Sequence, residues 1–339
     1  MSRNRPWAVL SLFALVLATS LLSLVAPVER AVGQAESDLS LPVRETVVTR
    51  DNKQLAITYY KSNGGKDAPV VVCLHERDGS RFVWQTKNGL AESLQKAGMA
   101  VVTLDFREHG ESREGGGALP VNANADPKNK KKDAKKPARP ESMLKPGDYQ
   151  AMVAGDMEAV KKFLFDKHQA EELNMSRLGL VGAEMGASVA INFALLDWLK
   201  EPFPDGVGLA RTPRGQDVRA IAMISPQTNF PGLPITKPLG DLKSPAFNVA
   251  FFVGVSKGDS KDKGQAKKIF DQVHQGQAEL PAEQRRVYLS EFPGGLHGTQ
   301  LLGQPRINME GLLVAFFSKH LKSVDIPWRD RRSKLNRDE

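Results

Sequence analysis

Short apolar runs alternate with segments of helical periodicity along most of the chain. Runs rich in valine, isoleucine and leucine predict buried strands at residues 45–50, 54–60, 70–74, 100–104, 178–181, 220–224, 249–253 and 287–292. Apolar positions three and four residues apart predict helices at residues 89–97, 150–167, 186–199 and 307–321. Strands that alternate with helices of this length form a mostly parallel sheet. We therefore expect an α/β fold with a mostly parallel central sheet and helices on both faces.

The first 35 residues do not fit this alternation. Arg3 and Arg5 precede an apolar run at residues 8–28, and small residues follow up to Ala35. This order is typical of a secretory signal peptide with cleavage after Ala35. An apolar run of ~20 residues is also long enough to span a bilayer. A cleaved signal and a retained N-terminal anchor therefore both remain open, and either predicts an exported protein, periplasmic or extracellular.

Residues 113–146 interrupt the pattern a second time. They contain three consecutive glycines, several prolines and a lysine-rich tract at residues 128–136. Such a composition cannot bury a core, and it predicts a disordered surface insertion. The folded domain is thus expected at residues 36–322, interrupted by this insertion. Residues 323–339 form a charged tail, which we expect to fray from Arg329 to Glu339.

The net charge of +8 is concentrated outside the predicted core. Residues 113–145 carry +5 and residues 1–35 carry +2, which leaves +1 for the rest of the chain. A nucleic-acid-binding face is therefore not supported. Cys73 is the only cysteine, so an intramolecular disulfide is impossible, and we expect a buried strand residue. No His-Glu-x-x-His motif, Cys/His cluster or lysine-containing phosphate loop is present, so we expect no metal and no cofactor.

The main chemical signal is the segment Gly182-Ala-Glu184-Met-Gly186. A predicted strand ends just before it and a predicted helix begins directly after it. A sharp strand–turn–helix of the form Gly-x-Ser-x-Gly presents a nucleophile at its central position, and it needs very small flanking residues. Gly182, Gly186 and Ala187 meet that need, but the central residue is a glutamate.

Three further motifs occur in a fixed order around this turn. They are Leu-His-Glu-Arg-Asp-Gly-Ser at residues 74–80, Asp-Phe-Arg-Glu-His-Gly-Glu-Ser at residues 105–112 and Gly-Gly-Leu-His-Gly at residues 294–298. With these motifs, roughly residues 45–322 resemble the α/β-hydrolase superfamily, particularly its dienelactone-hydrolase and serine-peptidase-like branches. The resemblance implies a small-molecule substrate or ligand, and it leaves the oligomeric state open.

The resemblance also implies roles for individual residues. His297 matches the catalytic histidine, and Asp259 matches the acid that orients it, with Asp262 as the alternative. The backbone amides of Arg77 and Met185 match the oxyanion donors. Each role is an expectation carried over by position.

Two positions depart from the pattern of the superfamily. Glu76 stands where glycine is usual, which puts the oxyanion loop in question. Glu184 replaces the serine, and a carboxylate that attacked an ester would form an anhydride, so serine-esterase or peptidase chemistry is not expected there. A carboxylate can instead displace an alkyl leaving group or open an epoxide. Ser188 lies one helical turn further on and does not replace the missing serine.

Three hypotheses follow from this sequence. The first is a non-catalytic or weakly active protein with a degenerate elbow and a binding or envelope role, in which Glu184 could simply pair with His297. The alternative is a hydrolase of an epoxide, alkyl halide or ester-like substrate that uses Glu184 with His297 and Asp259. In the third, the lysine-rich insertion carries the main role.

Overall fold

The computed structural model describes residues 39–113, 144–277, 279–281 and 283–336. The predicted signal peptide or anchor and most of the predicted insertion lie outside these residues. From Ser40 onward the chain forms one compact unit. Within the described ranges, no helix has the length and apolar character needed to cross a membrane.

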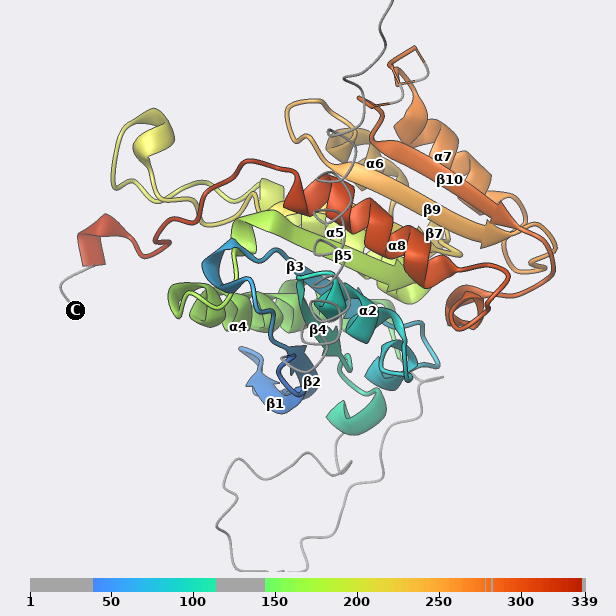
Figure 1. Ribbon diagram of the computed structural model, residues 1–339, viewed down its shortest axis with the longest axis horizontal. Helices are drawn as coiled ribbons and strands as arrows, with labels where there is room; N and C mark the ends of the chain where they lie inside the picture. Colours follow the sequence, from blue (N-terminus) through green and yellow to red (C-terminus); the bar gives the residue numbers. More distant parts are fainter. Residues whose placement is uncertain (1–38, 114–143, 278, 282, 337–339) are drawn as a thin grey trace, which may run out of the picture. The chain divides into compact units, whose positions relative to one another are not determined.

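An eight-stranded sheet forms the centre of this unit, with the strand order β1-β2-β4-β3-β5-β6-β9-β10 (Figure 1). The strands are β1 (Val43–Val48), β2 (Gln54–Tyr60), β3 (Val70–Leu74), β4 (Ala100–Leu104), β5 (Leu178–Ala183), β6 (Val218–Ile224), β9 (Ala250–Ser256) and β10 (Val287–Phe292). Only the pairs β1–β2 and β2–β4 are antiparallel. The predicted mostly parallel sheet is confirmed.

Seven α-helices are present in the described part of the chain. They are α2 (Leu90–Lys96), α3 (Pro146–Ala151), α4 (Met157–Gln169), α5 (Met185–Trp198), α6 (Thr236–Leu242), α7 (Gln265–His274) and α8 (Met309–Phe317). A π-helical segment, Met152–Asp156, joins α3 to α4, and Ser318–Lys322 extends α8 in the same way. The short strands β7 (Asn229–Phe230) and β8 (Leu233–Pro234) form a separate hairpin.

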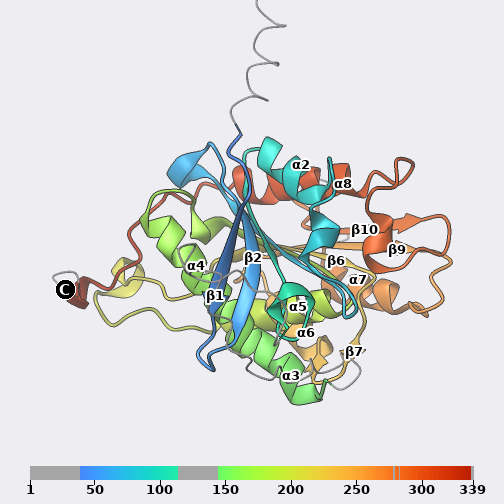
Figure 2. The same cartoon turned by 90° about the horizontal axis from the view of Figure 1, so that it is seen from below.

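Alternate strand residues supply two hydrophobic layers, one on each face of the sheet. Along β3, Val70, Val72 and Leu74 contribute to the layer that contains α4, α5, α6 and α7. Val71 and Cys73 contribute to the layer that contains α2 and α8. Figure 2 shows α2 and α8 on one side of the sheet and α5 and α6 on the other. Helices therefore cover both faces, as predicted.

The C-terminal tail differs from the sequence-based expectation. Arg331 is only 3% exposed, and its guanidinium donates hydrogen bonds to the Asp217 carboxylate at 2.6 and 3.0 Å. Trp328 donates from its indole nitrogen to the His168 carbonyl. The prediction that residues 329–339 fray is wrong at Arg331, because the buried Asp217 carboxylate, which directly precedes β6, binds the Arg331 guanidinium.

Candidate functional site

The turn between β5 and α5 holds Glu184 in a strained backbone conformation. Its φ is 47° and its ψ is −107°, in a region that non-glycine residues rarely adopt. Close backbone contacts enforce the turn: a Cβ on Gly182 would lie 2.3 Å from the Gly186 carbonyl carbon, and one on Gly186 would lie 2.2 Å from the Leu74 oxygen. Steric contact with the neighbouring backbone therefore explains why the residues that flank Glu184 are small.

His297 and Asp259 come together from loops that follow two neighbouring strands. The Asp259 Oδ2 lies 2.7 Å from the His297 Nδ1, and the two side chains are 1% and 12% exposed. Asp262 has a different role, because its carboxylate accepts the backbone N–H groups of Gly264 and Ala266 at the start of α7. Of the two candidate acids, only Asp259 contacts the histidine.

The second ring nitrogen of His297 is free. Nε2 is buried and has no hydrogen-bond partner in the described part of the molecule. Because Nδ1 donates its proton to Asp259, Nε2 carries the lone pair of the neutral ring. This is the tautomer that a general base requires.

The Glu184 carboxylate is bound by a residue that the sequence did not indicate. Gln227, in the loop after β6, donates its amide N–H to the Glu184 Oε1 at 3.1 Å. No hydrogen bond or ion pair joins Glu184 to His297 within the described ranges. The site is thus not held together by a Glu184–His297 pair. No local spacing could have revealed Gln227, because it lies 43 residues from Glu184.

The two backbone amides predicted as oxyanion donors make no internal hydrogen bond among the described residues. Neither the Arg77 N–H nor the Met185 N–H donates to another group in the described residues. The Glu76 carbonyl accepts the N–H of Gly79 at 3.0 Å and the Nδ1–H of His75 at 2.6 Å. These bonds fix the turn that follows β3, and both amides remain available for a ligand oxygen.

The side chain of Glu76 connects the oxyanion loop to the histidine loop. Its Oε2 accepts the Thr299 backbone N–H at 2.9 Å, and its Oε1 accepts the Thr299 hydroxyl at 2.6 Å. Gly298 makes room for this contact, since a Cβ there would lie 1.9 Å from the Glu76 Oε2. On its other side, the Gly298 N–H donates to the Ser225 hydroxyl. Glu76 thus has a positioning role that the sequence comparison with the superfamily did not indicate.

Two further histidines pack beneath the oxyanion loop. The Nε2 of His75 accepts the Phe106 N–H, and the Nδ1 of His109 donates to the Arg107 carbonyl. Burial, with a contribution from His109, lowers the pKa of His75 to about 3. Both rings pack within the loops that follow β3 and β4.

A tyrosine from α3 lies in the neighbourhood of the elbow. Tyr149 packs edge-on against Phe230 with a centroid distance of 4.8 Å. Burial raises the pKa of Tyr149, and the charges of Asp78 and Glu184 act in the same direction, while Arg77 opposes them. No sequence motif singles out this residue.

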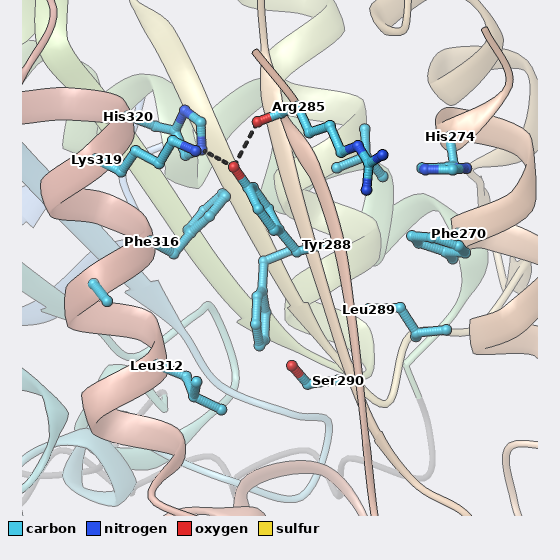
Figure 3. A pocket seen from close by; sticks show the side chains of 13 residues that line it. Phe270, His274, Arg285, Tyr288, Leu289, Ser290, Leu312, Phe316, Lys319 and His320 are labelled. Carbon is cyan, nitrogen blue, oxygen red and sulfur yellow. Dashed lines mark hydrogen bonds between the residues drawn. The ribbon is translucent and has the colours of Figure 1, made fainter. Parts of the chain in front are cut away.

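No group of three or more His, Cys, Asp or Glu residues in the described ranges is placed to hold a metal ion. Cys73 is buried, and burial raises the pKa of its thiol. A cavity of about 550 Å³ lies beside β10 and α8 (Figure 3), where the His320 ring bonds the Tyr288 hydroxyl. None of the predicted site residues lines that cavity.

Comparisons with known proteins agree on the fold. No family model and no curated protein matches the chain. Among solved structures, an esterase of Pyrococcus furiosus is 16% identical with a TM-score of 0.53, over 83% of this chain and 91% of the esterase. A Bacteroides ovatus protein assigned to dipeptidyl aminopeptidase IV is 12% identical with a TM-score of 0.51, over 84% of this chain and 36% of that protein. With the sheet order, the strained turn after β5 and the histidine after the last strand, these likenesses show that the chain has the α/β-hydrolase fold.

Proposed function

We propose that this protein is a hydrolase that uses the Glu184 carboxylate as a nucleophile toward an alkyl halide or an epoxide. One observation carries the proposal: Asp259 and His297 are assembled with Nε2 unpartnered, while Glu184 is held separately by Gln227. The strained backbone of Glu184 supports it, since such strain is typical of functional sites.

The proposed reaction has two steps. In the first, a Glu184 oxygen attacks an sp³ carbon, and the carbon–halogen bond breaks with its electron pair leaving as halide. For an epoxide, the carbon–oxygen bond breaks and the alkoxide takes a proton from water. Either substrate leaves an alkyl ester on Glu184.

In the second step, water cleaves this ester. The His297 Nε2 takes a proton from a water molecule whose oxygen adds to the ester carbonyl carbon. The amides of Arg77 and Met185 stabilise the resulting oxyanion, and Asp259 stabilises the imidazolium. Collapse expels the alkoxide, which takes the proton from His297 to become the alcohol, and Glu184 releases the remaining water proton to solvent, which regenerates its carboxylate.

The separation of Glu184 from His297 is compatible with this chemistry. A serine must give its proton to the histidine, so a serine hydrolase needs contact between the two side chains. An ionised carboxylate has no proton to give. In the proposed reaction the histidine must hold a water molecule instead, and an unpartnered Nε2 suits that task.

The test is to trap the alkyl ester. A His297→Gln variant is incubated with 1-bromohexane or styrene oxide, digested with trypsin and analysed by mass spectrometry. We expect one substrate-derived alkyl group on the peptide that spans residues 178–200, because the ester forms but is not hydrolysed. The same variant with an additional Glu184→Gln change is the control and should carry no adduct. An unmodified peptide, together with no bromide release by the wild-type protein, would refute the proposal.

A second candidate function is binding without turnover, or with weak turnover. The Gln227 hydrogen bond favours it, because it engages one oxygen of a partly exposed carboxylate and so weakens the nucleophile. Relatives that form alkyl esters use aspartate, and glutamate is one methylene longer. Under this reading, 1-bromohexane would raise the melting temperature of the wild-type protein without bromide release. An envelope location remains a separate prediction, which cell fractionation and sequencing of the mature N-terminus would test.

A further inference from the structure

Arg77, a cation in the loop after β3, has no anionic partner among the described residues. Its Nε is buried and makes no hydrogen bond, and no ion pair of Arg77 occurs among the described residues. Its guanidinium carbon lies 4.9 Å from the centre of the Phe230 ring. The next arginine along the chain differs, since Arg81 is paired with both Asp105 and Glu111.

The residues that surround Arg77 come from the same segment of the chain as the residue that binds Glu184. Phe230, beneath the guanidinium, also packs against Tyr149, and Gln227 of the same loop bonds Glu184. The charges of Arg77 and Glu184 act on the pKa of the Tyr149 phenol in opposite directions. The backbone N–H of Arg77 is itself a predicted oxyanion donor.

We propose that Arg77 binds a carboxylate group of the substrate, so that the site takes an anionic compound with an apolar body. A guanidinium presents a planar fork of donors that matches a carboxylate, and the aromatic pair Phe230 and Tyr149 offers an apolar wall beside it. A bound carboxylate satisfies the buried donor, which otherwise carries a desolvation cost. Halo acids and epoxy acids fit this description. The reaction rests on the proposed function, whereas the carboxylate binding does not.

Two acidic groups oppose an anionic ligand. Asp78 is exposed, so water screens its charge, and Glu184 already accepts a hydrogen bond from Gln227. The alternative role for Arg77 is purely structural, as a cation that covers the Phe230 ring. A matched pair of ligands separates the two roles.

The binding test compares 4-phenylbutyrate with 4-phenylbutanamide by isothermal titration calorimetry. The two probes share a body and differ in charge. We expect the wild-type protein to bind the acid about tenfold more tightly than the amide. An Arg77→Met variant keeps a side chain over Phe230, and it should bind both probes equally. Lys261→Met, which removes a cation from the Asp259 loop, is the control and should preserve the preference.

Equal binding of the two probes by the wild-type protein would overturn the inference, as would an equal loss of preference in the two variants. The same titration with a Glu184→Gln variant separates carboxylate binding by Arg77 from the proposed function. A retained preference for the acid, with no bromide release from 6-bromohexanoate by the wild-type protein, supports the Arg77 site and removes the nucleophile. Equal bromide release from 6-bromohexanoate and 1-bromohexane supports the nucleophile and removes the Arg77 site.

Discussion

Two polar regions of this molecule differ in whether their buried polar atoms are paired. At the amino end of β6, the Asp217 carboxylate lies 2.6 Å from Arg331 and 2.9 Å from Lys161, and Lys161 also pairs with Asp197. At the carboxyl ends of the strands, the His297 Nε2 and the Arg77 Nε are buried, and neither has a hydrogen-bond partner in the part of the chain that the structure describes. The first region satisfies its charges internally, and the second leaves donors and a base for something else.

This difference separates structural from functional polarity. A buried donor or acceptor without a partner costs about 1–3 kcal/mol, so stability alone favours pairing. The Asp217 cluster (Lys161, Asp197, Asp217 and Arg331) follows that rule. Burial alone would raise the pKa of Asp217, but Arg331 and Lys161 lower it below its usual value. Several buried atoms at the carboxyl ends of the strands break the rule within the described residues, and among them the His297 Nε2 and the Arg77 Nε belong to residues that the superfamily resemblance had singled out.

The largest expected effect comes from breaking the Asp217 cluster. Asp217→Ala leaves Arg331 and Lys161 facing each other without this carboxylate, and it should lower the free energy of unfolding by about 3–5 kcal/mol. Urea denaturation measures the change. Arg77→Met, in the loop after β3, should change the midpoint of urea denaturation little.

A matched surface pair provides the control for this comparison. Lys162 and Asp166 form an exposed ion pair on α4, and Asp166→Ala should have little effect. Equal destabilisation by Asp217→Ala and Asp166→Ala would remove the distinction between the two regions.

Acid should weaken the packing around His75 and His320 before it weakens the Asp217 cluster. Burial lowers the pKa of His75 to about 3, and burial with the nearby Arg286 and Lys319 lowers that of His320 to about 4. Because these pKa values lie below the unfolded value of 6.5, their stabilisation is complete above pH 6.5 and is lost as the pH falls toward 3. We expect His75 to contribute a loss of about 3 kcal/mol between pH 7 and pH 4, and His320 a slightly smaller one.

Urea denaturation at several pH values measures the loss of unfolding free energy, which should be smaller in a His320→Gln variant. Amide hydrogen exchange should rise at residues 75–80 while residues near Asp217 stay protected, since the pKa of Asp217 is lowered. Protection that fell first around Asp217 would reverse the proposed order.

The Glu76 contact should have a moderate effect. Glu76→Ala removes both hydrogen bonds to Thr299 and should cost about 1–2 kcal/mol of unfolding free energy. Thr299→Val removes one of the two bonds, and a double-mutant cycle measures the coupling. Additive effects of the two substitutions would show that the loops are not linked through this carboxylate.

The smallest effect is a gain in stability. Glu184→Gly relieves the strained φ of 47° and should raise the free energy of unfolding by about 1 kcal/mol, measured by thermal and urea denaturation. Glu184→Ala keeps the strain and serves as the control. A stability loss in the glycine variant would mean that the Gln227 contact outweighs the strain.

Local patterns were sufficient to predict the fold. The apolar runs gave the main strands, and the small residues around Glu184 identified the turn before α5. Patterns failed where partners are distant in sequence. Asp259 and Asp262 occupy one loop, and only the position of His297, 38 residues from Asp259, distinguishes them. Glu76 and Thr299 are separated by 223 residues, and Arg331 and Asp217 by 114. Such contacts depend on the assembled sheet.

The central claim is that Asp259, His297 and the amides of Arg77 and Met185 form a complete hydrolase site in which only the nucleophilic group has changed. The most direct test is p-nitrophenyl acetate hydrolysis by a Glu184→Ser variant, with the fold checked by circular dichroism. Because Asp259, His297 and the two oxyanion amides are in place, we expect a rate at least about 100-fold above that of the wild-type protein, with acetylation of the peptide at residues 178–200. A folded variant with no activity above the wild-type protein would contradict the account.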